Sequence, residues 1–256
     1  MTRVIARLDI KNGAVIKGIQ LEGQRRIGDP IEIATGYYQD GIDEILLMDS
    51  VASLYGRSNL FHTVSDACRQ VFVPITMGGG IRSLADVEAA LAAGADKVAV
   101  NTGLTRRPEL IGEIANVYGS QCLVGSIEAK WTGAGWEAYV SNGREPTGRE
   151  VRHWARELQE RGVGEILVTS VDREGTKRGF DIPLCQLVAA GVSVPVIASG
   201  GAGGLADIRQ LDEAVQVQGI AVASLLHYKL ATIEAIKAQL PRSTVRRQQN
   251  DTGRPQ

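Results

Sequence analysis

Two acidic side chains occur at matching places in the sequence. Asp9 lies at the end of the apolar stretch 3–10, and Glu128 directly follows the apolar stretch 122–127. Two carboxylates on opposite sides of one substrate can act as general acid and general base. Because the two halves of the chain are similar, we expect both carboxylates to face each other across one site. The alternative is that each caps a loop or pairs with a nearby lysine.

A glycine turn followed by a helical pattern occurs within residues 73–102. The three glycines at 78–80 let the backbone turn sharply and approach a ligand with no side chain in the way. The next apolar run ends at Asn101 and Thr102. Backbone N–H groups and the dipole at a helix N-terminus suit a dianion. One such turn is also typical of an ordinary loop.

The same arrangement recurs at residues 194–224. Pro195 follows Pro74 by 121 residues, and residues 205–207 repeat the Leu-Ala-Asp of residues 84–86 at that distance. Matches in the same order indicate a duplicated half. We therefore predict two phosphate sites, and a substrate with a phosphate at each end. The predicted sites are Gly80, Asn101 and Thr102 in the first half, and Gly201, Ala223 and Ser224 in the second.

Apolar stretches alternate with helical patterns along the whole chain. This order predicts a (β/α)8 barrel built from two half-barrels, about 1–120 and 121–240, and a doubly wound open sheet is the alternative. The chemistry of such barrels lies at the C-terminal ends of the strands. The polar residues 241–256 predict a disordered tail. The expected strands are 3–10, 44–49, 74–77, 97–100, 122–127, 165–169, 195–198 and 219–222, and the expected helices include 31–40, 60–71, 108–117, 147–161, 183–190 and 229–239.

Two long polar excursions interrupt this alternation. Residues 11–30 predict a small hairpin followed by a mobile loop, and residues 131–146 predict a hairpin at the corresponding place in the second half. Loops of this length within compact domains are usually functional. We therefore expect the first excursion to be functional.

The composition excludes several classes of function. The chain has 256 residues and a net charge of −1, so electrostatics does not favour nucleic acid or an anionic membrane as a partner. Three scattered cysteines favour a reducing compartment, and no metal ion or cofactor is predicted. No signal peptide or long apolar run occurs, so we expect the protein to be cytoplasmic.

Four charged residues begin strands, at the end of the barrel opposite to the acids. Two are basic, Arg3 and Lys97, and two are acidic, Glu44 and Glu165. One interpretation is a neutralised ring that contributes only stability. The other is a ring that gates a passage along the barrel axis.

Four motifs resemble the cyclase subunit of imidazole glycerol phosphate synthase. They are RLDIKNGAVIKG, GGGIRSLADVEAALAAGADKVAVNT, VTSVDREGTKRGFD and VIASGGAG, and the resemblance extends over residues 3–240. It implies a bis-phosphorylated formimino aminoimidazole carboxamide ribotide as substrate, and ammonia supplied by a glutaminase partner. Cyclisation and cleavage would give imidazole glycerol phosphate and aminoimidazole carboxamide ribotide. The sister isomerase of histidine biosynthesis fits these motifs less well.

The resemblance also implies roles for individual residues. Asp9 and Glu128 correspond to the acid–base pair, and Lys17 to a lysine on a loop that closes over the substrate. The four strand-start charges correspond to an ammonia gate, and Asp96 beside them to the glutaminase interface. The implied substrate- and phosphate-binding residues are Lys17, Asp49, Gly80, Asn101, Thr102, Thr169, Glu174, Gly175, Ser199, Gly200, Gly201, Ala223 and Ser224.

Three residues near the expected site depart from the family pattern. Arg7 replaces a cysteine, and Glu128 and Glu174 each replace an aspartate. Displacing a reacting group by roughly 1 Å can cost on the order of 100-fold in rate. Two alternatives therefore stay open: a paralogue that uses ammonia to modify a surface-sugar precursor, and a phosphate-binding scaffold without catalysis.

Overall fold

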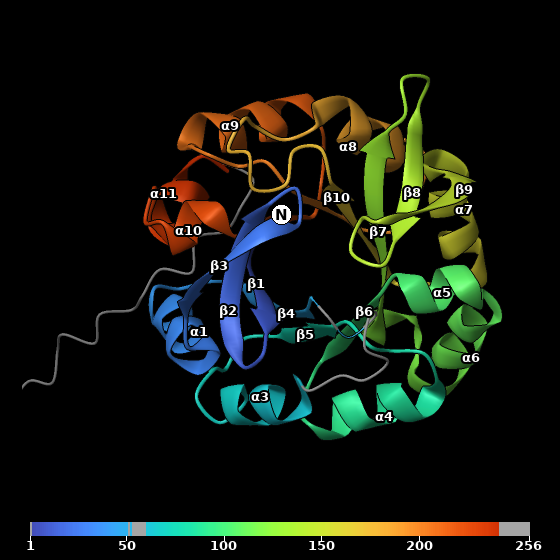
Figure 1. Cartoon of the computed structure of the whole chain (residues 1–256), viewed down its shortest axis with the longest axis horizontal. Helices are drawn as coiled ribbons and strands as arrows, with labels where there is room; N and C mark the ends of the chain where they lie inside the picture. Colours follow the sequence, from blue (N-terminus) through green and yellow to red (C-terminus); the bar gives the residue numbers. More distant parts are fainter. Residues whose placement is uncertain (1, 51, 53–59, 241–256) are drawn as a thin grey trace, which may run out of the picture.

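The barrel is closed by eight parallel strands. The computed structural model describes residues 2–50, 52 and 60–240, so the predicted tail 241–256 lies outside the described residues. Each strand pairs with the next, and the last, β12, pairs with β1, which confirms the predicted (β/α)8 barrel (Figure 1). The strands are β1 (Arg3–Lys11), β4 (Glu44–Asp49), β5 (Ile75–Gly78), β6 (Lys97–Val100), β7 (Leu123–Trp131), β10 (Glu165–Ser170), β11 (Val196–Ser199) and β12 (Gly219–Val222).

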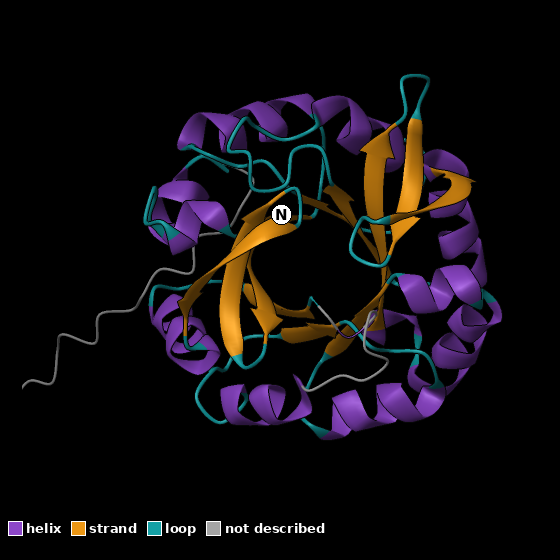
Figure 2. Cartoon of the chain, viewed as in Figure 1, coloured by secondary structure: helices purple, strands orange, loops and turns teal. Residues whose placement is uncertain are grey.

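Helices form an outer ring around these strands (Figure 2). Local signals start several of them: the Ser83 side chain and Asp86 form a capping box at the start of α4, and Asp29 caps α1. The described helices are α1 (Pro30–Gln39), α3 (Leu60–Ala67), α4 (Leu84–Ala92), α5 (Thr102–Arg106), α6 (Glu109–Tyr118), α7 (Val151–Arg161), α8 (Ile182–Ala189), α9 (Leu205–Ala214), α10 (Ser224–His227) and α11 (Ile233–Ala238), with a 3-10 turn η1 (Ser120–Cys122) before β7.

The apolar residues form two cores. The larger core lies between the strands and the helices, because one face of each strand points outward against the helix ring. The smaller core fills the barrel interior with one layer of side chains from seven strands. Its members are Ile5, Leu46, Ala99, Val124, Leu167, Ile197 and Ala221.

The two glycine turns have the same backbone geometry. Gly80 and Gly201 both have positive φ values, of 82° and 106°. The residues before the two short helices also match, with φ −113° and ψ −82° at Asn101, and φ −129° and ψ −74° at Ala223. The repeated sequence therefore folds into repeated local structure at both predicted phosphate sites.

Three predicted segments differ from the structure. The small hairpin expected within residues 11–30 is present as β2 (Ala14–Ile19) paired with β3 (Glu22–Gly28), but the mobile loop expected after it is wrong, because β3 leads almost directly into α1. The helix expected at 147–161 starts at Val151, because β9 (Glu145–Glu150) pairs with β8 (Trp136–Val140). The helix expected at 229–239 is wrong in its first part, since a left-handed Lys229, with φ 53°, separates α10 from α11.

The β2–β3 hairpin folds back over the barrel mouth (Figure 1). β2 pairs antiparallel with the end of β1, placing Ile16 opposite Asp9. Beyond the strand, the Gln20 N–H donates to the Glu174 carbonyl oxygen at 2.7 Å. A Cβ atom at Gly175 would lie 2.1 Å from the Gly18 carbonyl oxygen. The close approach of hairpin and loop therefore requires glycine at position 175.

Gly175→Ala should destabilise the fold more than Gly148→Ala does. Both glycines have a φ of 71°, so each alanine costs about 1–2 kcal/mol of backbone strain. A Cβ atom added at Gly148 would have no atom within 4 Å, whereas one at position 175 meets the hairpin backbone. The extra overpacking should lower the free energy of unfolding by a further ~1–3 kcal/mol. Equal values from urea denaturation would contradict this packing argument.

Candidate active site

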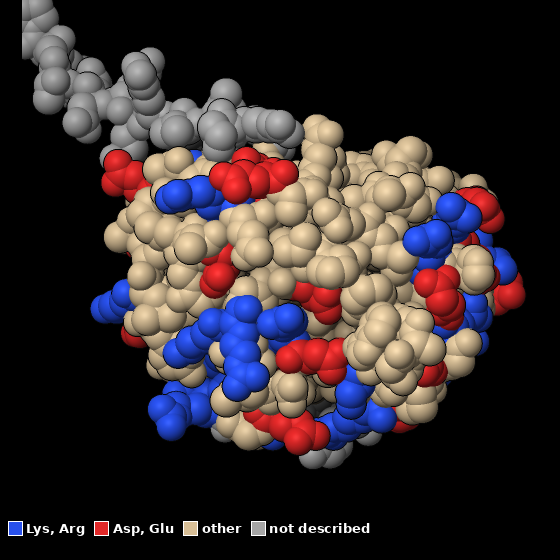
Figure 3. Space-filling view, turned by 90° about the horizontal axis from the view of Figure 1, so that it is seen from above, with Lys and Arg blue, Asp and Glu red and all other residues tan. Residues whose placement is uncertain are grey.

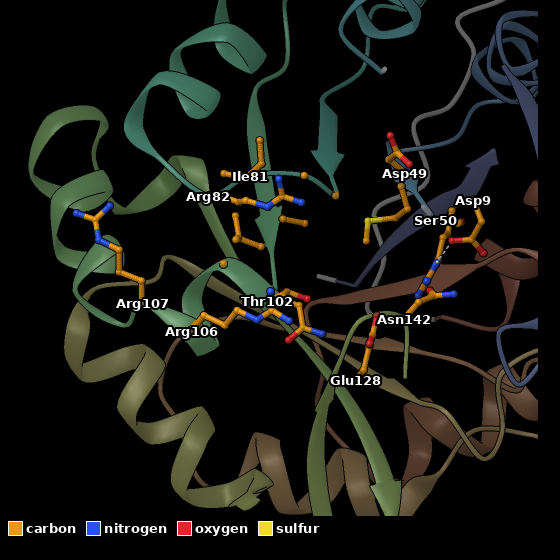
Figure 4. Close-up of a pocket in the computed structure, with 18 residues that line it drawn as sticks. Asp9, Asp49, Ser50, Ile81, Arg82, Thr102, Arg106, Arg107, Glu128 and Asn142 are labelled. Carbon is orange, nitrogen blue, oxygen red and sulfur yellow. Dashed lines mark hydrogen bonds and ion pairs between the residues drawn. The ribbon is translucent and has the colours of Figure 1, made fainter. Parts of the chain in front are cut away.

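Three neighbouring hollows, which share some of their lining residues, lie at the C-terminal mouth of the barrel. The largest, about 170 Å³, is lined by Asp9 and Glu128 together with residues of the first glycine turn (Figure 4). A hollow of about 10 Å³ lies under the hairpin, and another of about 10 Å³ lies at the second glycine turn. The structure thus brings the predicted residues to one mouth: Asp9, Asp49, Gly80, Asn101, Thr102 and Glu128 in the first hollow, Lys17 and Glu174 under the hairpin, and Gly175, Ser199, Gly200, Gly201, Ala223 and Ser224 in the third.

Four buried charges of alternating sign occupy the centre of the mouth. The Arg7 guanidinium donates to Asp9 at 2.9 Å, and Lys17 Nζ lies 3.5 Å from the other Asp9 oxygen. Lys17 also forms an ion pair with Glu174. All four side chains are nearly inaccessible to solvent. The network joins β1, the hairpin and the loop after β10, and it places Lys17 over the mouth.

The surroundings of Asp9 keep it ionised. Burial alone would raise the pKa of this carboxyl group, but the charges of Arg7 and Lys17 outweigh burial and hold the pKa below its usual value. Asp9 is therefore a carboxylate at neutral pH and can accept a proton.

Glu128 has the opposite electrostatic character. Burial raises the pKa of this carboxyl group from 4.5 to about 7, although the Gly143 N–H donates to it at 2.7 Å and favours the charged form. A substantial fraction of Glu128 is therefore protonated at neutral pH. Two carboxyl groups whose surroundings push their pKa values apart are suited to act as an acid and a base.

Arg7 is the main residue whose contacts the sequence did not predict. Its guanidinium donates to Thr169 Oγ1 at 3.0 Å and to Ser199 Oγ at 3.3 Å. These residues lie on β10 and β11, neither of which pairs with β1, so the side chain crosses the barrel interior. The alternation of β1 places Arg3, Arg7 and Asp9 on one face, and this signal could have predicted the direction of Arg7.

The second excursion packs against the first glycine-turn site. The Asn101 side-chain amide donates to the Tyr139 carbonyl oxygen at 2.9 Å, and Thr102 Oγ1 accepts from the Ser141 N–H at 3.2 Å. Both partners belong to the β8–β9 excursion, as does Asn142, which lines the largest hollow. The sequence did not predict Asn142, whose left-handed φ of 62° is set by the turn between the strands.

The four charges at the other end of the barrel form a closed ring. Lys97 lies 3.1 Å from both Glu44 and Glu165, and Arg3 lies 2.6 Å from Glu44. Arg3 also forms an ion pair with Glu165. Each cation therefore contacts both carboxylates. The ring lies directly beneath the apolar layer of the barrel interior.

Asp96 lies beside this ring on the exposed N-terminal end of the barrel. One of its carboxylate oxygens accepts from the Ile75 N–H at 2.8 Å, which holds the side chain against the end of β5. Asp96 itself is exposed. It is therefore available for contact on the face opposite to the mouth.

The described part of the chain shows neither a metal site nor a membrane span. No group of three or more His, Cys, Asp or Glu side chains there could hold a metal ion. None of its helices is long and apolar enough to cross a bilayer. On the side of the barrel seen in Figure 3, basic and acidic side chains lie next to one another.

The fold and the mouth define a (β/α)8 barrel with two buried carboxyl groups and two glycine turns at its C-terminal end. The chain belongs to the family described as histidine biosynthesis protein, whose model matches residues 3–232. This finding confirms the family resemblance seen in the motifs.

Three relatives carry the name imidazole glycerol phosphate synthase subunit HisF. The chain is 56% identical over 204 residues to the protein of Legionella pneumophila, covering 79% of this chain and 96% of that protein. It is 43% identical over 245 residues to that of Lactococcus lactis subsp. cremoris (strain SK11), covering 95% of each. It is 44% identical over 241 residues to that of Myxococcus xanthus (strain DK1622), covering 94% of this chain and 95% of that protein.

The raised pKa of Glu128 predicts a pH-dependent loss of stability. Because folding raises this pKa from 4.5 to about 7, the protonated side chain contributes stability that is fully present below pH 4.5 and is lost as the pH rises through about 7. Glu128→Gln cannot lose that proton. Urea denaturation should therefore show the native protein losing stability relative to the variant across this pH window. A constant difference between the two proteins would contradict the raised pKa.

Proposed function

We infer that this chain is the cyclase subunit of an imidazole glycerol phosphate synthase and acts in histidine biosynthesis. The family match and the three HisF relatives support this assignment. The observation that carries the chemistry is the placement of two buried carboxyl groups in one hollow, where their surroundings hold the pKa of Asp9 below its usual value and raise that of Glu128 to about 7. The subunit is a lyase that works within a glutamine amidotransferase complex.

We propose that the substrate is the bis-phosphorylated formimino aminoimidazole carboxamide ribotide. One phosphate binds at Gly80 and Thr102, and the other at Gly201 and Ser224, where positive-φ glycines bring backbone N–H groups to the mouth. The two sites lie in different halves, so the substrate spans the mouth past Asp9 and Glu128. This arrangement exposes the middle of the substrate to both carboxyl groups.

The two carboxyl groups divide the proton transfers between them. When ammonia attacks a carbonyl carbon, the oxygen gains a proton and the nitrogen loses one. Protonated Glu128 donates the first, and ionised Asp9 accepts the second. The oxygen then leaves as water, so the former carbonyl carbon keeps the new nitrogen. This nitrogen closes the ring on the formimino carbon, whose bond to the ribotide nitrogen breaks as that nitrogen takes a proton and the ring nitrogen loses one, and the same pair can carry both protons. The products are imidazole glycerol phosphate, aminoimidazole carboxamide ribotide and water.

The ammonia comes from a glutaminase partner bound at the N-terminal end of the barrel. The ring of Arg3, Glu44, Lys97 and Glu165 would act as the gate, and exposed Asp96 as an interface residue. Above the ring, the apolar layer favours neutral ammonia over ammonium, because burying an unpaired charge is costly. A ring of pairwise contacts can open by moving one long side chain, and this supports a gate over a purely stabilising role.

Asp9→Asn and Glu128→Gln should retain substrate binding and lose turnover. Each amide keeps the shape of the carboxyl group but cannot exchange a proton usefully near neutral pH, so we expect a loss of at least ~100-fold in kcat. Steady-state kinetics with the ribotide and an ammonium salt would measure this loss. The control is Glu128→Asp, which keeps a carboxyl group and should change the rate only moderately. If folded, phosphate-binding native protein shows no turnover, the cyclase assignment is wrong and the surface-sugar alternative returns.

Asp96→Lys should separate the two sources of ammonia. We expect glutamine-dependent activity with the partner to be abolished, because the charge reversal disrupts the interface, while activity with ammonium salt stays unchanged. Glu32→Lys is the control, since this exposed glutamate lies in the first turn of α1, at the mouth end of the helix ring. Equal loss of both activities in Asp96→Lys, or an equal effect of the control, would contradict an interface at this end.

A further inference from the structure

Two arginine side chains lie beside the first glycine-turn site. Arg82 lies two residues after Gly80, and Arg106 is the last residue of α5. Both line the largest hollow, and Figure 4 shows them pointing towards the space next to Thr102. A third arginine of the lining, Arg107, points away from this space in the same view, and its guanidinium forms an ion pair with Glu113. Two of the three arginines that line the hollow are therefore directed at the space beside the turn.

The second glycine-turn site has no such pair at the equivalent positions. The residue equivalent to Arg82 is Gly203: each donates its N–H to the carboxylate of the next helix, Arg82 to Asp86 at 2.9 Å and Gly203 to Asp207 at 2.8 Å. Asn101 precedes α5 and Ala223 precedes α10 with similar backbone angles. The fifth residue after Asn101 is Arg106 and the fifth after Ala223 is Tyr228, so these two positions correspond. The backbones agree, so the two sites differ in these side chains, and the second has one cation nearby, Lys177, whose Nζ lies 4.3 Å from the centroid of the Tyr228 ring.

The two hollows also differ in size. The second, at about 10 Å³, holds the centre of roughly one water-sized group, whereas the first measures about 170 Å³. The first hollow extends from the two arginines to Asp9 and Glu128, so its volume covers the centre of the mouth as well as the space beside the turn. Its carboxylates, Asp9, Asp49 and Glu128, lie on the other side of the hollow from the two arginines (Figure 4).

The charges of the two arginines are weakly compensated. Arg106 lies 3.4 Å from Glu145, but both side chains are more than half exposed, and such pairs contribute little. Arg82 donates to the Ala52 carbonyl oxygen at 2.8 Å, and no carboxylate of the described residues forms an ion pair with it. Both guanidinium groups are thus available for an anion, which they can bind through two parallel hydrogen bonds each.

We propose that Arg82 and Arg106 form an additional anion subsite, so that the first half binds a diphosphate group while the second half binds a single phosphate. One phosphate of the diphosphate contacts the turn at Gly80, and the other contacts the two guanidinium groups. This goes beyond the proposed function, whose substrate carries one phosphate at each end. Diphosphate esters would accordingly compete with that substrate for the mouth.

Titration calorimetry with inorganic phosphate and pyrophosphate tests the subsite without any turnover. Native protein should bind pyrophosphate at least about tenfold more tightly than phosphate, since two charge-assisted contacts are added. The double variant Arg82→Gln/Arg106→Gln should lose this preference and still bind phosphate. Both substitutions lie at exposed positions, and circular dichroism would verify the fold. Because only binding is measured, a failure of the cyclase assignment would leave the result intact.

Two further variants make the result specific. Arg107→Gln removes the same charge from the arginine that is turned away, and should keep the preference for pyrophosphate. Ser224→Asp blocks the second site with a negative charge, and should also keep it. Equal affinities for the two anions in native protein, a preference that survives in the double variant, or equal loss in Arg107→Gln or Ser224→Asp would each overturn the proposal.

Discussion

The barrel mouth depends on one buried network of alternating charges. Arg7, Asp9, Lys17 and Glu174 link the first strand, the hairpin above it and the loop after β10. Removing one member would leave an uncompensated buried charge, which typically costs about 3–5 kcal/mol. The same contacts keep Asp9 ionised and hold Lys17 over the mouth. The position of the hairpin and the protonation of the site therefore have a common physical cause.

The two ends of the barrel use charge in different ways. At the N-terminal end, two cations and two carboxylates neutralise each other in a closed ring. At the mouth, the network leaves Glu128 outside the pairing, and burial can raise its pKa. The apolar layer between them separates the two sets of charges. Such a layer lets a small neutral molecule pass at lower cost than an ion, which is the property that a passage for ammonia requires.

Much of the fold and of the site could be predicted from the sequence, because both rest on local patterns. Strand alternation, glycine turns and the repeat predicted the barrel and placed Asp9, Glu128 and the two turns at one mouth. The contacts of Arg7 could not be predicted, because its side chain reaches strands that are distant in sequence. The sequence also did not predict that β3 extends to Gly28, because its pairing with β2 takes the place of the expected loop. Nor did it predict that the left-handed backbone of Lys229 divides the last expected helix. Arg82 and Arg106 belong to different βα units, so only the folded chain brings them together.

Of the three departures that the family resemblance implies, only Arg7 changes the charge of the site. A cysteine at position 7 would leave Asp9, Lys17 and Glu174 with a net charge of −1, whereas Arg7 makes the four-residue network neutral. A neutral network exerts less repulsion on Glu128 than a negative one, so the proton on Glu128 is determined mainly by burial. The longer Glu174 side chain still reaches Lys17 from its loop. What an acid–base pair requires is two carboxyl groups in opposite protonation states within reach of one substrate. Asp9 and Glu128 meet the first requirement through their different surroundings, whatever the length of the second side chain.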